Sequence, residues 1–258
     1  MFRLAKPVVG IQLYSLRDQT EIDFLGTLEK IAKIGYKAVE FTGYFKTPVS
    51  ELKSKLDELG LLAPSVHVPI NFSDTKHMQS DFAGQIKYAK ELGLSYVVTP
   101  WGPLPEHPTV SSVDYLIEKL TQLGEQVKDA GMQYSYHNHD FEFKLVDDEP
   151  VIDHILKKVP PDLLVMQFDL GWIYMAGHSP AKYLEKYKGR VPTVHLKDFS
   201  KGRIDAEIGK GEVGYSQLLN AVESADVSFM FVEQEQFESS SLESAENSFK
   251  YLQSQGFV

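Results

Sequence analysis

The 258-residue chain contains no cysteine. That absence excludes disulfides, thiolate metal ligands and a cysteine nucleophile. The formal net charge is −10, which disfavours nucleic acid as a partner because phosphate binding needs Lys and Arg. No apolar run reaches the roughly 18 residues of a membrane span, and the N-terminus lacks the apolar core of a signal peptide. We therefore expect a cytoplasmic protein that binds neither nucleic acid nor membranes.

The chain also lacks a dividing segment, because no linker rich in Pro, Gly or Ser, no low-complexity tract and no block of like charge interrupts it. Its length is close to the roughly 250 residues of a single TIM barrel. The apolar fraction of 43% is sufficient for one large core. We expect a single domain over residues 1–258.

Eight short apolar runs alternate with segments that have helical periodicity. The runs cover residues 8–13, 36–39, 61–66, 96–98, 132–136, 163–168, 191–194 and 229–232. The first four helical segments each end at a glycine: Gly35, Gly60, Gly93 and Gly131. Such alternation predicts a parallel sheet, and eight units favour a closed (β/α)8 TIM barrel. An open doubly wound sheet is the alternative, although no G-x-G-x-x-G follows the first run.

Polar residues suited to metal chemistry follow several of these runs, and in a barrel the carboxyl ends of the strands converge on one mouth. Asp169 ends an apolar run, where a carboxylate is costly unless it is paired, binds a cation or caps a helix. His195 and Lys197 share one face of their strand, with chemistry suited to a divalent ion and to an anionic oxygen. Glu233 ends the last run and is a ligand candidate. Glu235 lies further up the mouth as a substrate contact.

Five further residues at or near the strand ends could contact a substrate. His137 and His139 share a face in the densest polar cluster of the chain, which makes a metal or substrate role more credible there than for an isolated pair. Glu40 and His67 close the second and third runs and could either contact substrate hydroxyls or serve as structural caps. Trp101 could stack on a sugar ring or simply cover the barrel.

Several motifs resemble the sugar phosphate isomerase/epimerase family, a group of xylose isomerase-like TIM barrels with inosose dehydratase-like and endonuclease IV-like relatives. The motifs are GIQLYSLR (10–17), AVE (38–40), VHVP (66–69), YHNH (136–139), FEF (141–143), HLKD (195–198) and VEQ (232–234). The resemblance spans essentially the whole chain. It implies an enzyme that acts on a small sugar or sugar derivative.

The family resemblance also implies one divalent metal ion held by two Glu, one Asp and one His. Asp169, His195 and Glu233 match three of these ligands. Many relatives carry Glu where this chain has His137, and the pattern of one subgroup implies that Glu142 supplies the carboxylate while His137 acts as an acid or base. His137 as a direct ligand is the alternative. An oxygen-rich set with one imidazole suits Mn²⁺ first, and also Mg²⁺, Co²⁺ or Zn²⁺.

The reaction expected from this resemblance is isomerisation or epimerisation of a ketose or related sugar, phosphorylated or not, through an enediolate. Glu233 or His137 would take the proton and Lys197 would support the developing charge. A lyase or dehydratase acting on a keto-sugar, 3-keto-glycoside or inosose would share the first step. An endonuclease IV-type phosphodiesterase and a non-catalytic sugar-binding barrel are further alternatives. Homo-oligomers are common among such barrels, but the sequence reveals no interface.

Overall fold

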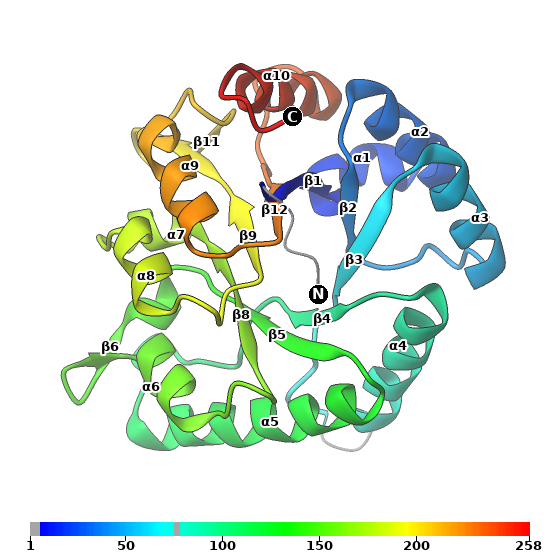
Figure 1. The fold of residues 1–258 in the computed structure, drawn as a ribbon. Helices are drawn as coiled ribbons and strands as arrows, with labels where there is room; N and C mark the ends of the chain where they lie inside the picture. The colour runs from blue at the N-terminus through cyan, green and yellow to red at the C-terminus, as the bar shows by residue number, and fades with distance from the viewer. Residues whose placement is uncertain (1–5, 75–77) are drawn as a thin grey trace.

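The computed structural model describes residues 6–74 and 78–258. Eight parallel strands close into a barrel in the order β1-β12-β9-β8-β5-β4-β3-β2, and helices surround it (Figure 1). Closure is complete because β1 pairs with β2 on one side and with β12 on the other. The predicted (β/α)8 TIM barrel is confirmed.

The barrel strands lie within two residues of the predicted runs. They are β1 (Val8–Gln12), β2 (Ala38–Phe41), β3 (Leu62–His67), β4 (Tyr96–Thr99), β5 (Gln133–His137), β8 (Val165–Asp169), β9 (Thr193–Leu196) and β12 (Phe229–Val232). Strands β2, β8 and β9 each continue one or two residues beyond the predicted end. Glu40, Asp169 and His195 therefore lie inside strands, where backbone pairing fixes the direction of each side chain.

Helices follow the strands, and all but the short α1 and α7 match segments with the predicted periodicity. They are α1 (Arg17–Thr20), α2 (Phe24–Ile34), α3 (Val49–Leu59), α4 (Met78–Leu92), α5 (Val110–Asp129), α6 (Val151–Lys158), α7 (Leu170–Met175), α8 (Pro180–Lys186), α9 (Tyr215–Ser224) and α10 (Ser241–Ser254), with 3₁₀ turns η1 (Leu13–Leu16) and η2 (Phe141–Phe143). At the end of α3, Gly60 adopts a left-handed conformation with φ +64° and its N–H closes the last turn. No helix in the described ranges combines the length and apolar character needed to cross a membrane.

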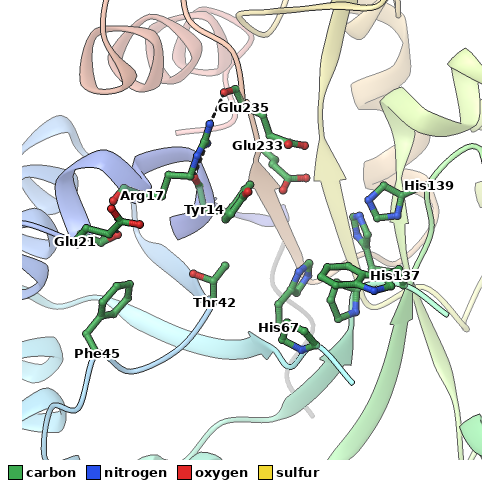
Figure 2. A pocket seen from close by; sticks show the side chains of 14 residues that line it. Tyr14, Arg17, Glu21, Thr42, Phe45, His67, His137, His139, Glu233 and Glu235 are labelled. Atoms are coloured by element: carbon green, nitrogen blue, oxygen red, sulfur yellow. Dashed lines mark hydrogen bonds between the residues drawn. The ribbon is translucent and has the colours of Figure 1, made fainter. Parts of the chain in front are cut away.

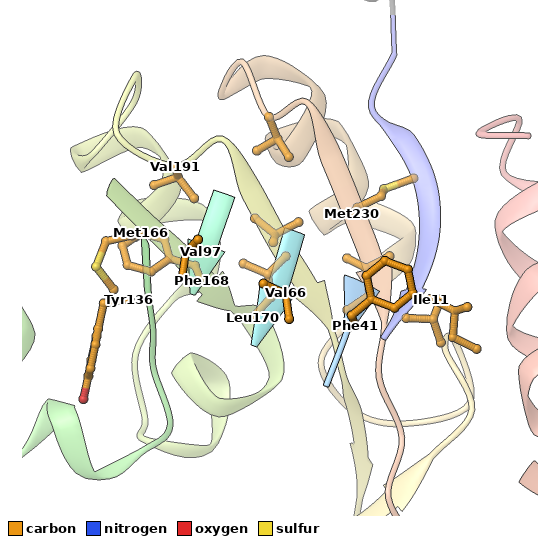
Figure 3. Packing of buried hydrophobic residues seen from close by; sticks show 14 of the residues in the cluster. Ile11, Phe41, Val66, Val97, Tyr136, Met166, Phe168, Leu170, Val191 and Met230 are labelled. Atoms are coloured by element: carbon orange, nitrogen blue, oxygen red, sulfur yellow. The ribbon is translucent and has the colours of Figure 1, made fainter. Parts of the chain in front are cut away.

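The two faces of the barrel strands differ in polarity. Outward side chains such as Ile11, Val66 and Met166 are buried against the helices, as Figure 3 shows. At the amino end the interior is apolar, and a side chain at Gly10 would lie 2.6 Å from the ring of Phe231, so only glycine fits there. Towards the carboxyl end the interior becomes polar, and that layer supports the site.

Two small hairpins and two short helices decorate the barrel and were not predicted from periodicity. The hairpins are β6 (Leu145–Val146) with β7 (Glu149–Pro150) and β10 (Asp198–Ser200) with β11 (Ile204–Ala206). The helices are α1 and α7, and α7 begins directly after Asp169. These elements are too short for periodicity to reveal them.

Candidate metal and substrate site

Four buried side chains from four different parts of the barrel converge at its carboxyl end. His137 comes from β5, Asp169 from β8, His195 from β9 and Glu233 from the residue after β12. One donor atom of each lies within 4.8 Å of every other. Two imidazoles and two carboxylates at this spacing form a donor set that fits a first-row divalent cation.

Two atoms of this group have no hydrogen-bond partner among the described residues, although both are buried: Asp169 Oδ2 and His137 Nδ1. Buried polar atoms are normally paired, so two orphaned atoms in one cluster fit a ligand role. Burial raises the pKa of the Asp169 carboxyl to about 7, against the opposing effect of Lys197. A cation would remove the cost of ionising that carboxyl in the barrel.

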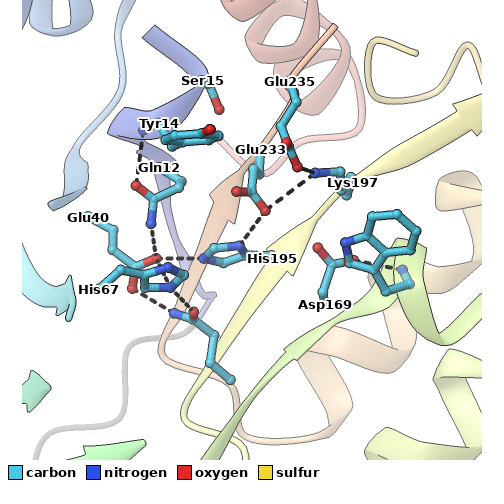
Figure 4. Close-up of polar contacts among 12 residues, drawn as sticks. Gln12, Tyr14, Ser15, Glu40, His67, Asp169, His195, Lys197, Glu233 and Glu235 are labelled. Atoms are coloured by element: carbon cyan, nitrogen blue, oxygen red, sulfur yellow. Dashed lines mark hydrogen bonds and ion pairs between the residues drawn. The ribbon is translucent and has the colours of Figure 1, made fainter. Parts of the chain in front are cut away.

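His195 lies between two carboxylates (Figure 4). Its Nε2 is 2.6 Å from Glu40 Oε1 and its Nδ1 is 2.9 Å from Glu233 Oε2. Burial disfavours the charged imidazolium, but Glu40 and Glu233 outweigh burial and raise the pKa of His195 to about 10. In the metal-free protein, a doubly protonated His195 therefore bridges Glu40 and Glu233.

Glu142 lies outside the group of four. Its Oε1 accepts a hydrogen bond from the hydroxyl of Tyr136 at 2.6 Å, and its Oε2 accepts one from the backbone N–H of His139 at 2.8 Å. Both oxygens are thus used to fix the loop that follows β5. The structure brings His137, rather than Glu142, to Asp169, His195 and Glu233.

Lys197 is buried beside the cluster, with 1% of its side chain exposed. Its ammonium group pairs with Glu235, lies 3.8 Å from Glu233 Oε2 and sits over the ring of Trp172. Burial opposes its charge, but Glu233 and Asp169 raise the pKa of Lys197 above its ordinary value. Lys197 therefore supplies a fixed positive charge next to the carboxylates.

Above the cluster, a pocket of about 490 Å³ opens at the mouth of the barrel. Figure 2 shows His137 and His139 at one end of it and Glu21 and Phe45 at the other. Its walls are formed by Tyr14, Arg17, Thr20, Glu21, Thr42, Phe45, His67, Pro69, Pro100, Trp101, His137, His139, Glu233 and Glu235. The volume is typical of pockets that enclose small organic ligands.

The predicted substrate contacts divide into two groups. His67, Trp101, His139 and Glu235 line the pocket, whereas Glu40 is fully buried beneath it. Because β2 continues to Phe41, Glu40 points into the barrel one layer below the mouth. Tyr14, Arg17 and Phe45 also line the pocket and were not among the predicted contacts. Tyr14, in η1, and Phe45, in a loop, are both more than 40% exposed, and neither lies in a segment whose periodicity would mark it.

A second donor group shares two members with the first. Nitrogen atoms of His67, His137 and His195 also lie within 4.8 Å of one another. However, His67 Nε2 is 2.6 Å from Gln167 Oε1 and 3.1 Å from Glu40 Oε1. Because His67 Nε2 already contacts Gln167 and Glu40, the group that contains Asp169 and Glu233 is the better cation site.

The glycine-rich loop after β11, residues 209–214, binds the carboxylate of Asp198. The carboxylate of Asp198 accepts hydrogen bonds from the backbone N–H groups of Gly209, Gly211 and Val213 at 2.9–3.2 Å, and a fourth from Phe199 at 3.0 Å. Those N–H groups could have formed a phosphate site. Asp198 already occupies them.

A family model described as "Xylose isomerase-like TIM barrel" matches residues 28–255. The chain belongs to this family. An inosose dehydratase from Geobacillus kaustophilus is 26% identical over 188 residues, which is 66% of this chain and 60% of that enzyme. The match thus spans about three fifths of the length of that relative.

Two solved structures that resemble this one align along nearly the whole chain. A sugar phosphate isomerase/epimerase from Parabacteroides distasonis has a TM-score of 0.82 and 26% identity, with 99% of this chain and 96% of that one covered. A D-psicose 3-epimerase from Clostridium cellulolyticum has a TM-score of 0.77 at 13% identity, with 96% and 98% covered. At 13% identity the likeness shows the fold alone. The proteins similar to this chain thus include a sugar phosphate isomerase/epimerase and an inosose dehydratase.

Proposed function

We propose that this protein is a divalent-metal-dependent sugar isomerase or epimerase that removes a proton from the carbon next to a carbonyl group. The observation that carries the proposal is the pair of unpartnered buried atoms, Asp169 Oδ2 and His137 Nδ1, in a four-residue donor group beneath the pocket. Most buried polar atoms in proteins are paired, so two unpaired atoms within one donor group support a ligand role.

His137, Asp169, His195 and Glu233 would hold the ion. A bound divalent cation supplies Lewis acidity at a substrate carbonyl oxygen. Two imidazoles and two carboxylates suit Mn²⁺, Co²⁺ or Zn²⁺ better than Mg²⁺, which prefers oxygen ligands. Mn²⁺ remains the first candidate.

With His137 in the donor set, His139 is the best placed base. It lines the pocket, and its Nδ1 has no hydrogen-bond partner in the described part of the chain. Burial is the main reason why the pKa of His139 falls to about 4, so its imidazole is neutral at pH 7 and can accept a proton. Its ring stacks on Phe141 with centroids 5.3 Å apart, which fixes its orientation. Glu233, the other candidate base, is already bonded to His195.

Lys197 would balance the negative charge that develops when the proton leaves. Its ammonium group lies 3.8 Å from Glu233 Oε2 and is held by Glu235 and the face of Trp172. A preorganised charge of this kind acts without reorganisation of solvent during the reaction.

Dehydration of a keto-sugar or inosose is the second candidate. It is supported by the inosose dehydratase relatives and by a first step that is identical. After proton removal, loss of a hydroxyl group from the next carbon gives an unsaturated ketone and water. Return of the proton instead gives an isomer or epimer.

The test has two stages. Metal analysis of untagged protein should find about one Mn, Co or Zn ion per chain. The metal-loaded protein should then exchange the proton next to the carbonyl for deuterium when ketoses, inososes and 3-keto-glycosides are screened in D₂O. Product masses separate isomerisation from dehydration. Absence of exchange throughout the panel with all three ions would contradict the proposal.

A further inference from the structure

The carboxylate of Glu40 is fully buried in the barrel and makes more polar contacts than a structural cap needs. Side chains from four other strands surround it. Its partners are Gln12 Nε2 (2.6 Å), Ser65 Oγ (2.5 Å), Gln167 Nε2 (2.6 Å), His195 Nε2 (2.6 Å) and His67 Nε2 (3.1 Å). Figure 4 shows Gln12, His67 and His195 next to Glu40. A buried carboxylate is tolerated when its lone pairs are satisfied in this way.

These contacts keep Glu40 below the pocket. Ser65 and Gln167 hold its Oε2, while Gln12 and His195 share its Oε1. Glu40 is not among the residues that line the pocket, nor is it part of the donor group of four. It therefore has no route to a substrate or to an ion except through another residue.

That residue is His195. Its two ring nitrogens point in opposite directions, Nε2 to Glu40 and Nδ1 to Glu233 in the donor group. A neutral imidazole carries one proton, and a carboxylate at Nε2 favours the form in which that proton stays on Nε2. The Nδ1 lone pair is then directed at the position of the ion.

We propose that Glu40 is a positioning residue for the metal site, which holds the His195 ring and keeps its proton on Nε2 so that Nδ1 is free to bind a divalent cation. This inference rests on the proposed function, because it needs the ion. Carboxylates that orient a ligating histidine typically change metal affinity 10–100-fold when they are replaced. Glu40 reaches its ligand across the barrel, from β2 to β9.

The experiment measures metal affinity rather than turnover. Mn²⁺ and Co²⁺ binding to the full-length protein is followed by calorimetry, and the visible spectrum of the Co²⁺ form reports the ligand geometry. Glu40→Gln should weaken binding of both ions by about 10–100-fold and shift the Co²⁺ spectrum. Glu40→Asp keeps the charge but is one methylene shorter. It should also lose affinity, because the proposed role depends on position and not on charge alone.

Asp153→Asn is the matched control. Asp153 is a buried carboxylate in α6 that pairs with Lys186 at 2.8 Å and contacts Tyr183 and Tyr187, remote from the donor group. Its replacement should lower stability but leave both affinities unchanged. If Glu40→Gln does not fold, Ser65→Ala removes one support of Glu40 and should still weaken binding several-fold.

The outcomes separate the two proposals. A wild-type protein that binds no ion overturns the proposed function. A wild-type protein that binds the ion, with Glu40→Gln or Ser65→Ala unchanged from it, overturns the role of Glu40 alone.

Discussion

Asp169 uses its two carboxylate oxygens for different purposes. Oδ1 accepts a hydrogen bond from the backbone N–H of Trp172 at 2.8 Å and so caps helix α7, whereas Oδ2 has no partner among the described residues. A helix cap and an open ligand position thus belong to one side chain. The two readings of this residue from sequence, cap and functional carboxylate, are compatible.

Asp169→Asn should separate these roles. The amide oxygen can still cap α7, so the free energy of unfolding of the metal-free protein should change by no more than about 1 kcal/mol. Replacing the unpartnered oxygen by an NH₂ group should weaken Mn²⁺ binding by more than 10–100-fold, the loss typical of replacing a residue that only orients a ligand. Calorimetry and urea unfolding measure the two effects. Asp23→Asn, at the cap of α2, is the control and should leave Mn²⁺ binding intact.

Glu142 should make stability depend on pH. Burial raises the pKa of Glu142 from 4.5 to about 7, despite hydrogen bonds from Tyr136 and His139 that lower it. The folded state therefore binds more protons than the unfolded state between these values, and stability falls as pH rises through them. Relative to Glu142→Gln, the metal-free wild type should lose roughly 3 kcal/mol between pH 4 and pH 8.

Urea unfolding of both proteins at several pH values checks this expectation. Glu106→Gln, which replaces an exposed carboxylate, should leave the wild-type profile unchanged. A constant difference between wild type and Glu142→Gln would mean that Glu142 is ionised in the folded protein and would reopen its role as a metal ligand.

The sequence predicts the fold and part of the pocket because both depend on strand ends. Alternating apolar runs and terminal glycines identify the eight units, and residues after the runs fall at one mouth because parallel strands have one direction. The structure brings Asp169, His195 and Glu233 together as the resemblance implied. The apolar runs do not show how deep in the barrel each polar side chain lies. Strand β2 ends two residues later than the run that predicts it, and Glu40 therefore lies beneath the pocket.

The fourth member of the donor group depends on a local turn that has no periodic signal. The 3₁₀ turn Phe141–Phe143 directs Glu142 back to the backbone of His139, away from the donor group. Only the three-dimensional path of that turn distinguishes Glu142 from His137. The contacts between Asp198 and the glycine-rich loop also have no periodic signal in the sequence. The N–H groups that Asp198 accepts from lie 11–15 residues after it.

Replacement of Asp198 should loosen that loop. Asp198→Ala removes the acceptor for four backbone N–H groups and should cost about 3 kcal/mol of stability. Amide hydrogen exchange at Gly209, Gly211 and Val213 should accelerate more than at the barrel strands. Asp57→Asn, an exposed carboxylate on α3, is the control and should change neither quantity. Unchanged protection at the three amides would show that the loop is held by other contacts.

His137 and His139 lie two residues apart and should respond differently to the same substitution. His137→Gln should weaken Mn²⁺ binding, because it removes a member of the donor group. His139→Gln should retain the ion and slow deuterium exchange by about 10²–10⁴-fold, the range expected for loss of a general base. Metal analysis and exchange rates on the same preparations test the pair. The reverse result would assign His137 as the base and return the fourth ligand to another residue.

Trp101 offers a test of the pocket wall. Its side chain is 45% exposed at the mouth, so it contributes little to the core, and its face is available to an apolar surface of a sugar ring. Trp101→Ala should raise KM by about 2–12-fold, corresponding to 0.5–1.5 kcal/mol for a lost aromatic contact, with kcat nearly unchanged. Trp101→Phe should recover much of the loss because it keeps an aromatic face. The alternative role, a lid on the barrel, predicts instead a lower free energy of unfolding with KM unaffected, and urea unfolding of the same two variants distinguishes the roles.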